Sequence, residues 1–176
     1  YVTRSPVTIG ESTLVRGYWL KSLELAVGSD VVEMGSGQGQ FSTLMALAGF
    51  NVTAVDIHEG YNKVACHLAE IHGTQINTST ADMLEFEPKQ SVDAVVFCES
   101  FHHCDNPNLL IERVSKYVKP TGRIFFFGEP ITVFPVPWGV RLDGQSIWAA
   151  RKHGWLELGF NTAFFKELLN RHGWQI

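Results

Sequence analysis

A glycine-rich turn, Gly35-Ser-Gly-Gln-Gly39, constrains the fold of this chain more than any other feature. It directly follows residues 30–34, an apolar segment with the length of a buried strand, and it precedes a helical pattern that runs through residues 41–47. Glycines at such a junction let the backbone turn sharply and let a ligand approach it closely. The sequence therefore predicts a strand, a ligand-binding turn and a helix in that order.

The same alternation of strand and helix continues along the chain. Strands are expected at residues 30–34, 51–55, 75–79, 92–97 and 123–127. Helices are expected at residues 14–26, 41–47, 61–72, 107–118 and 162–172, with Pro120 and Gly122 ending the fourth. Five strands alternating with helices indicate an α/β fold with a doubly wound, mostly parallel sheet.

The end of the chain predicts an incomplete sheet. Residues 174–176 have the character of a further strand, and the sequence stops there. We therefore expect a single domain over residues 1–176 that lacks its last edge strands and is truncated at its C-terminus. An uncovered fifth strand would be a template for pairing, which favours an oligomer or a longer native chain.

Composition limits the classes of partner. With 14 basic and 18 acidic side chains, a formal charge of −4 and no clustered Lys or Arg, the chain is not expected to bind nucleic acid. No apolar run reaches the roughly 20 residues that span a membrane, and no signal segment is recognisable. Three cysteines, an odd number, favour free thiols. These features predict a protein of the cytoplasm.

The spacing of the glycines separates two kinds of nucleotide site. A dinucleotide fingerprint needs glycine at the sixth position of G-x-G-x-x-G, where this chain has Gln40. The pattern here is G-x-G-x-G, and Glu33 precedes it at the end of the strand. Asp56 stands at the end of the second strand, about 20 residues later, where its carboxylate could accept hydrogen bonds from both ribose hydroxyls. An NAD-dependent oxidoreductase is therefore the weaker interpretation.

With these motifs, residues 30–127 resemble the class I S-adenosylmethionine-dependent methyltransferases that act on small molecules or sugars. The resemblance implies a cofactor-binding core over residues 28–127. It implies that the methionine end of the cofactor is held by Glu33, Gly35, Ser36, Gly37 and Gly39. It further implies contacts of the ribose with Asp56, of the adenine with Ile57, Asp82 and Met83, and of the methionine and methyl group with Cys98, Glu99 and Ser100.

Two adjacent histidines follow the fourth strand, where the methyl group should face its acceptor. His103, or less favourably His102, could act as a general base toward a hydroxyl, although either could instead hold the loop before Asp105. Cys98 and Cys104 beside them also invite a zinc interpretation. Because no second Cys/His segment exists to complete such a site, no metal is expected.

Residues 128–161 form a long stretch without a clear pattern, and loops of this length are usually functional. We expect them to bind the acceptor. Tryptophans in this stretch could stack on a sugar ring while Glu129, Arg141 and Asp143 bind its hydroxyls, or the tryptophans could simply pack beside the sheet.

The sequence therefore predicts methyl transfer from S-adenosylmethionine to an oxygen of a small polar acceptor, with a saccharide as the finer expectation. A second hypothesis belongs to another functional class. The chain could be a non-catalytic domain that keeps the fold and uses the aromatic segment to bind a partner.

Overall fold

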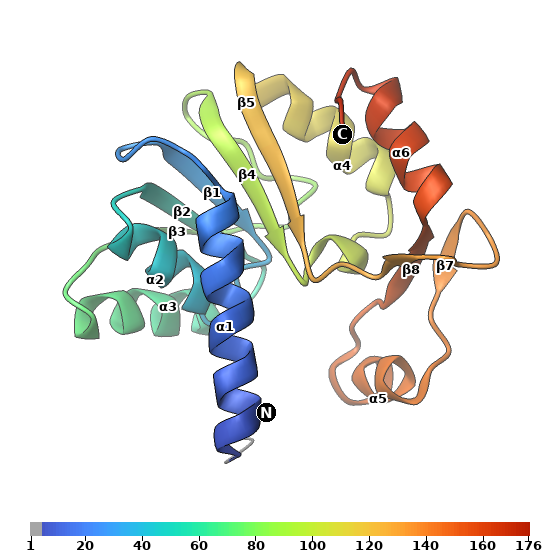
Figure 1. Ribbon diagram of the computed structural model, residues 1–176, viewed down its shortest axis with the longest axis horizontal. Coiled ribbons are helices and arrows are strands. Elements are labelled where there is room, and N and C mark those ends of the chain that lie inside the picture. Colours follow the sequence, from blue (N-terminus) through green and yellow to red (C-terminus); the bar gives the residue numbers. More distant parts are fainter. Residues whose placement is uncertain (1–4) are drawn as a thin grey trace.

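The computed structural model describes residues 5–176 and has a central sheet of five parallel strands in the order β3-β2-β1-β4-β5 (Figure 1). The strands are β1 (Asp30–Met34), β2 (Asn51–Asp56), β3 (Asn77–Thr80), β4 (Val92–Cys98) and β5 (Val118–Phe127). The order reverses between β1 and β4, which confirms the predicted doubly wound α/β fold. In such sheets ligands bind beside the reversal, at the carboxyl ends of the strands.

Helices cover both faces of this sheet (Figure 1). They are α1 (Pro6–Ser22), α2 (Gln40–Leu47), α3 (Glu59–Ile71), the 3-10 helix η1 (Phe101–His103), α4 (Pro107–Tyr117), α5 (Gly144–His153) and α6 (Thr162–Arg171). Because neighbouring strand residues point to opposite faces, Val31 of β1 packs in a cluster with Phe41 of α2, whereas Val32 packs in a cluster with Ile111 of α4. Burial on both faces explains why these strands are almost continuously apolar.

The fifth strand begins earlier than predicted. Helix α4 ends at Tyr117, and β5 starts at Val118 and runs through Pro120 and Gly122, so the expectation of a helix to residue 118 and a strand from residue 123 was wrong there. The register between β4 and β5 shifts after the Val92–Val118 pair. An edge strand with such an irregularity tolerates proline, because its N–H groups need not all join the ladder.

The segment 128–161 is also more ordered than predicted. It contains α5 and the strands β6 (Ile131–Thr132), β7 (Trp138–Val140) and β8 (Leu158–Asn161), which form a second sheet in the order β6-β8-β7. The Asp143 side chain accepts a hydrogen bond from the Ser146 N–H and so caps α5. Strands of two to four residues carry too little alternation to be recognised in a sequence.

The two ends of the described chain differ from expectation as well. Helix α1 starts at Pro6 and has no buried residue; Leu14 and Tyr18, predicted to form an apolar face, are 75% and 71% exposed. At the other end, residues 174–176 form no strand, and the Trp174 indole N–H donates to the Ser115 hydroxyl at 2.8 Å. Among residues 5–176, no helix is both long enough and apolar enough to cross a membrane.

Gly39 joins the glycine turn to α2 in a way that only glycine permits. Its φ is +72°, and a Cβ built there would lie 2.4 Å from the Cβ of Ala65 in α3. Gly73 has the same φ of +72° but has open space around it. Both positions therefore need a left-handed backbone, but only Gly39 also lacks room for a side chain.

We expect Gly39→Ala to lower the free energy of unfolding by about 1 to 3 kcal/mol more than Gly73→Ala does. Both substitutions strain the backbone, but only Gly39→Ala also overpacks the space against α3. Urea unfolding followed by circular dichroism measures both values. Equal losses in the two variants would contradict the close approach of α2 and α3 at this point.

Candidate functional site

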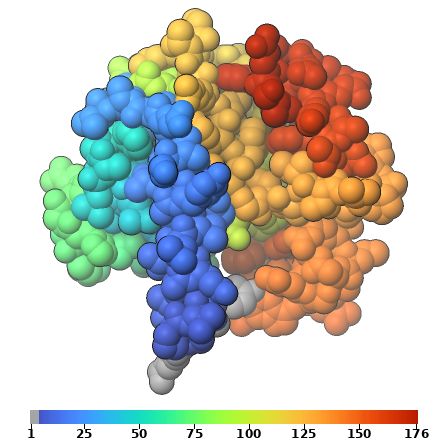
Figure 2. Space-filling model, viewed as in Figure 1, coloured from blue at the N-terminus to red at the C-terminus, as the bar shows by residue number. Residues whose placement is uncertain are grey.

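A cleft of about 1300 Å³ opens at the carboxyl ends of β1, β2 and β4, beside the reversal of strand order. Helix α1 and the segment at the end of α5 stand on either side of it; Figure 2 shows them in blue and orange on the lower part of the molecule. Ten of the predicted cofactor residues line the cleft: Glu33, Gly35, Ser36, Gly37, Asp56, Ile57, Asp82, Met83, Cys98 and Glu99. Gly39 is absent from this lining because it packs against α3.

The glycine turn is held against the neighbouring strands by its own backbone. The Ser36 N–H donates to the Val55 carbonyl oxygen at 3.0 Å, and the Gly37 N–H donates to Asp56 Oδ2 at 2.9 Å. At Gly35, a Cβ would lie 2.6 Å from the Cβ of Ser100, so the turn and the end of β4 touch directly. The Ser36 hydroxyl is buried without a hydrogen-bond partner among the described residues. Its oxygen is therefore free to hydrogen-bond with a ligand bound at the turn.

Two aspartates lie at successive strand ends on one side of the cleft. Asp56 Oδ1 accepts from the His58 N–H at 2.8 Å, and Asp82 Oδ1 accepts from the Leu84 N–H at 2.7 Å. These bonds fix the carboxylates, and each oxygen can accept more than one hydrogen bond. The arrangement fits the hydroxyls of a ribose and the amine of an adenine, which are hydrogen-bond donors.

Glu33 is a buried carboxyl group at the base of the turn, only 2% exposed. Burial raises its pKa from 4.5 to about 7, and the hydrogen bond from the Ser42 hydroxyl opposes that rise. A cationic partner would strongly stabilise the ionised form of such a buried carboxyl group. The ammonium of a bound amino acid is such a partner, so Glu33 and the glycine turn fit the methionine end of S-adenosylmethionine.

His102 lies behind the cleft rather than in its wall. Glu129 accepts hydrogen bonds from the backbone N–H groups of Ser100, Phe101 and His102 at 2.8, 2.9 and 3.2 Å, and its Oε2 also lies 2.7 Å from Nδ1 of His102. The Glu129 side chain is 1% exposed. This carboxylate therefore holds the start of η1, and the His102 ring faces Glu129.

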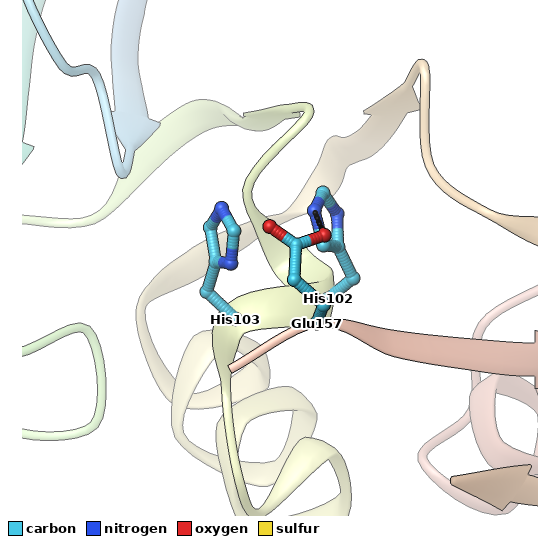
Figure 3. A group of neighbouring side chains, drawn as sticks. All are labelled: His102, His103 and Glu157. Carbon is cyan, nitrogen blue, oxygen red and sulfur yellow. Dashed lines mark ion pairs between the residues drawn. The ribbon is translucent and has the colours of Figure 1, made fainter. Parts of the chain in front are cut away.

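Of the two adjacent histidines, His103 is the one that lines the cleft. Figure 3 shows its ring beside His102 and Glu157. Its Nδ1 lies 2.6 Å from the carbonyl oxygen of Leu156, which can only accept, so Nδ1 carries the proton and Nε2 keeps its lone pair in the neutral ring. Burial, followed by the charge of His102, lowers the pKa of His103 below its ordinary 6.5. A neutral imidazole with a fixed tautomer is suited to accept a proton.

Residues 128–161, which were expected to bind the acceptor, contribute less to the cleft than the sequence predicted. Glu129, Arg141 and Asp143 are absent from the cleft wall: Glu129 holds η1, and Arg141 pairs with Asp143 at 3.0 Å. The segment reaches the cleft only through residues 152–156, where Trp155 is the single tryptophan in the wall. The remaining wall residues that the sequence did not single out include Arg16 of α1 and Tyr61 of α3. No motif marks these two, since the tertiary fold alone brings them there.

Comparison with known proteins agrees with this geometry. The family model described as a methyltransferase domain matches residues 32–126, more than half of the chain. The chain is 33% identical over 115 residues to a ubiquinone biosynthesis O-methyltransferase of Pseudomonas putida and 30% identical over 93 residues to one of Rickettsia conorii. It covers 49% and 32% of those proteins, and the matched parts are 64% and 53% of this chain.

A solved structure shows the same fold at lower identity. The S-adenosylmethionine dependent methyltransferase from Mesorhizobium loti superposes with a TM-score of 0.72 at 20% identity, over 92% of this chain and 82% of that one. Fold, glycine turn, paired aspartates and family match thus coincide on the same strand ends. The chain belongs to the class I S-adenosylmethionine-dependent methyltransferases.

Proposed function

We propose that this chain transfers the methyl group of S-adenosylmethionine to an oxygen atom of a small polar acceptor. The observation that carries the proposal is one continuous cleft, in which the glycine turn and Asp56 lie on one side and the His103 ring on the other. The names of the Pseudomonas and Rickettsia relatives, both O-methyltransferases, support oxygen as the methylated atom.

The cofactor supplies an electrophilic sulfonium methyl group when it is bound. The chain's own residues therefore have to bind the cofactor and the acceptor, orient them toward each other and exclude water. Ser36 offers an unpartnered hydroxyl, Glu33 offers a carboxylate to the ammonium, and Asp56 and Asp82 offer acceptors to the nucleoside. His103 takes the proton of the acceptor hydroxyl on Nε2, while the Leu156 carbonyl oxygen keeps the ring in the required tautomer.

The acceptor is proposed to present a flat ring to the end of α5. Trp155 and His153 stack there, with ring centroids 4.5 Å apart and an interplanar angle of 22°, and both line the cleft. A sugar or another hydroxylated ring has a face that packs on such a surface. The finer expectation of a saccharide rests on this stack alone, because Glu129, Arg141 and Asp143 are engaged elsewhere.

The raised pKa of Glu33 predicts how stability depends on pH. The unfolded chain loses this proton near pH 4.5 and the folded chain near pH 7, so the contribution of Glu33 to stability falls as pH rises through that window. We expect Glu33→Gln to remove this fall, which is on the order of 3 kcal/mol. Urea unfolding at pH 5 and pH 8 measures it, with the exposed Glu70→Gln as control. Parallel pH curves for Glu33→Gln and the unmodified chain would refute the assignment.

Asp56→Ala should weaken the binding of S-adenosylhomocysteine by about 2 to 3 kcal/mol, through loss of charge-assisted hydrogen bonds to the ribose. Isothermal titration calorimetry gives both dissociation constants. Asp105→Ala, at the other end of the cleft wall, should leave binding within about twofold of the unmodified chain. Failure of the unmodified, folded chain to bind would overturn the proposed cofactor.

Formation of S-adenosylhomocysteine from hydroxylated acceptors, monosaccharides and phenols among them, tests the reaction. With an active acceptor, we expect kcat to fall as pH drops through the lowered pKa of His103, since only the neutral ring accepts a proton. His103→Asn should lower kcat by roughly 10² to 10⁴ while preserving cofactor binding. His67→Asn, which removes an exposed histidine outside the cleft wall, is the control for kcat. Cofactor binding without turnover on any acceptor would favour the non-catalytic hypothesis.

A further inference from the structure

His102, His103 and Glu157 form a compact group at the acceptor end of the cleft, here called the His-His-Glu cluster (Figure 3). One ring nitrogen from each histidine and one carboxylate oxygen of Glu157 all lie within 4.8 Å of one another. The histidines come from η1 and the glutamate from the residue just before β8, so distant parts of the chain meet here. His102 is buried and the other two are half-buried, unlike a solvated charge cluster.

Each imidazole in the cluster already has one nitrogen in a hydrogen bond with a protein acceptor. His102 uses Nδ1 toward Glu129 at 2.7 Å, and His103 uses Nδ1 toward the Leu156 carbonyl oxygen at 2.6 Å. The Nε2 of His102 instead lies 3.5 Å from Glu157. Histidines that bind metals almost always donate their other ring N–H to a carboxylate or a carbonyl in this way. Both histidines are thus oriented as metal ligands are.

We propose that the His-His-Glu cluster binds one divalent transition-metal ion through Nε2 of His102, Nε2 of His103 and the Glu157 carboxylate. Two imidazoles and one carboxylate are a ligand set that suits zinc, iron or cobalt better than magnesium or calcium. Ligand atoms around such an ion lie about 3.3 Å apart, so the three side chains have to draw together by up to about 1.5 Å. With three protein ligands, a coordination position stays open, and His103 borders the cleft.

The charges around the cluster also favour a cation. Glu129 and Glu157 each place a carboxylate beside His102. A third carboxylate, that of Asp143, lies beyond Arg141, with which it pairs. Arg141 lies 3.8 Å from Glu157 and opposes a cation, but it pairs more closely with Asp143, at 3.0 Å. With His102 and His103 neutral, as metal ligands must be, the formal charge of these groups is negative.

A metal ion at this position would also change how the acceptor loses its proton. An acceptor oxygen in the open position would have its hydroxyl pKa lowered by the ion, and His103 would then serve as a ligand and not as the base. This consequence rests on the proposed function, whereas binding of the metal does not. The expectation of no metal counted only cysteine and histidine as ligands, and Glu157 is neither.

Metal binding can be measured without cofactor, acceptor or turnover. The tag-free chain is stripped with a chelator and titrated with Zn²⁺ by calorimetry and with Co²⁺ by visible absorption, which reports nitrogen and oxygen ligation directly. We expect one equivalent per chain, and we expect Glu157→Gln and His103→Asn each to weaken the affinity by roughly tenfold or more. His67→Asn, which removes an exposed histidine beside Glu70 on α3, should leave the affinity unchanged.

The outcomes separate this proposal from the proposed function. Far-ultraviolet circular dichroism checks that each variant retains its fold. Absence of saturable Zn²⁺ and Co²⁺ binding by the folded chain, or equal affinities in the unmodified chain and the cluster variants, would overturn the metal site and leave the methyltransferase proposal intact. Metal binding together with a lack of cofactor binding would overturn the proposed function alone.

Discussion

The functional geometry of this chain depends on the parallel direction of its central strands. Because β1, β2 and β4 all run the same way, their carboxyl ends meet at one edge of the sheet. The reversal of strand order between β1 and β4 then leaves a crevice at that edge that neither neighbouring helix covers. The glycine turn and the η1 histidines follow strands on either side of the reversal, so a single cleft receives both.

Glu129 has a comparable importance for the part of the cleft around η1. One nearly buried carboxylate accepts hydrogen bonds from three successive backbone N–H groups, those of Ser100 and of the first two residues of η1, and it also contacts the His102 ring. A turn that leaves buried N–H groups unpaired costs free energy for each of them. Glu129 removes that cost, and in doing so it couples the end of β5 to the end of β4. His103 is therefore placed by a residue that does not itself line the cleft.

Several groups in the cleft are held there at a cost in free energy. Glu33 is a buried carboxyl with a raised pKa, the Ser36 hydroxyl lacks a partner among the described residues, and Glu99 has a left-handed φ of 53° although it is not glycine. Such positions concentrate at functional sites, where binding recovers part of the cost. Their common location supports one binding surface over residues 33–36 and the end of β4.

The sequence by itself determined the central sheet and the side of the cleft that holds the glycine turn. Strand length, helical periodicity and the glycine turn are local patterns, so their positions could be predicted from neighbouring residues alone, and Asp56 and Asp82 followed from their places at strand ends. Only the tertiary structure decided the opposite side of the cleft, around η1. Short strands in residues 128–161 leave no periodic signal, and the roles of Glu129 and Glu157 arise because segments distant along the chain meet around η1.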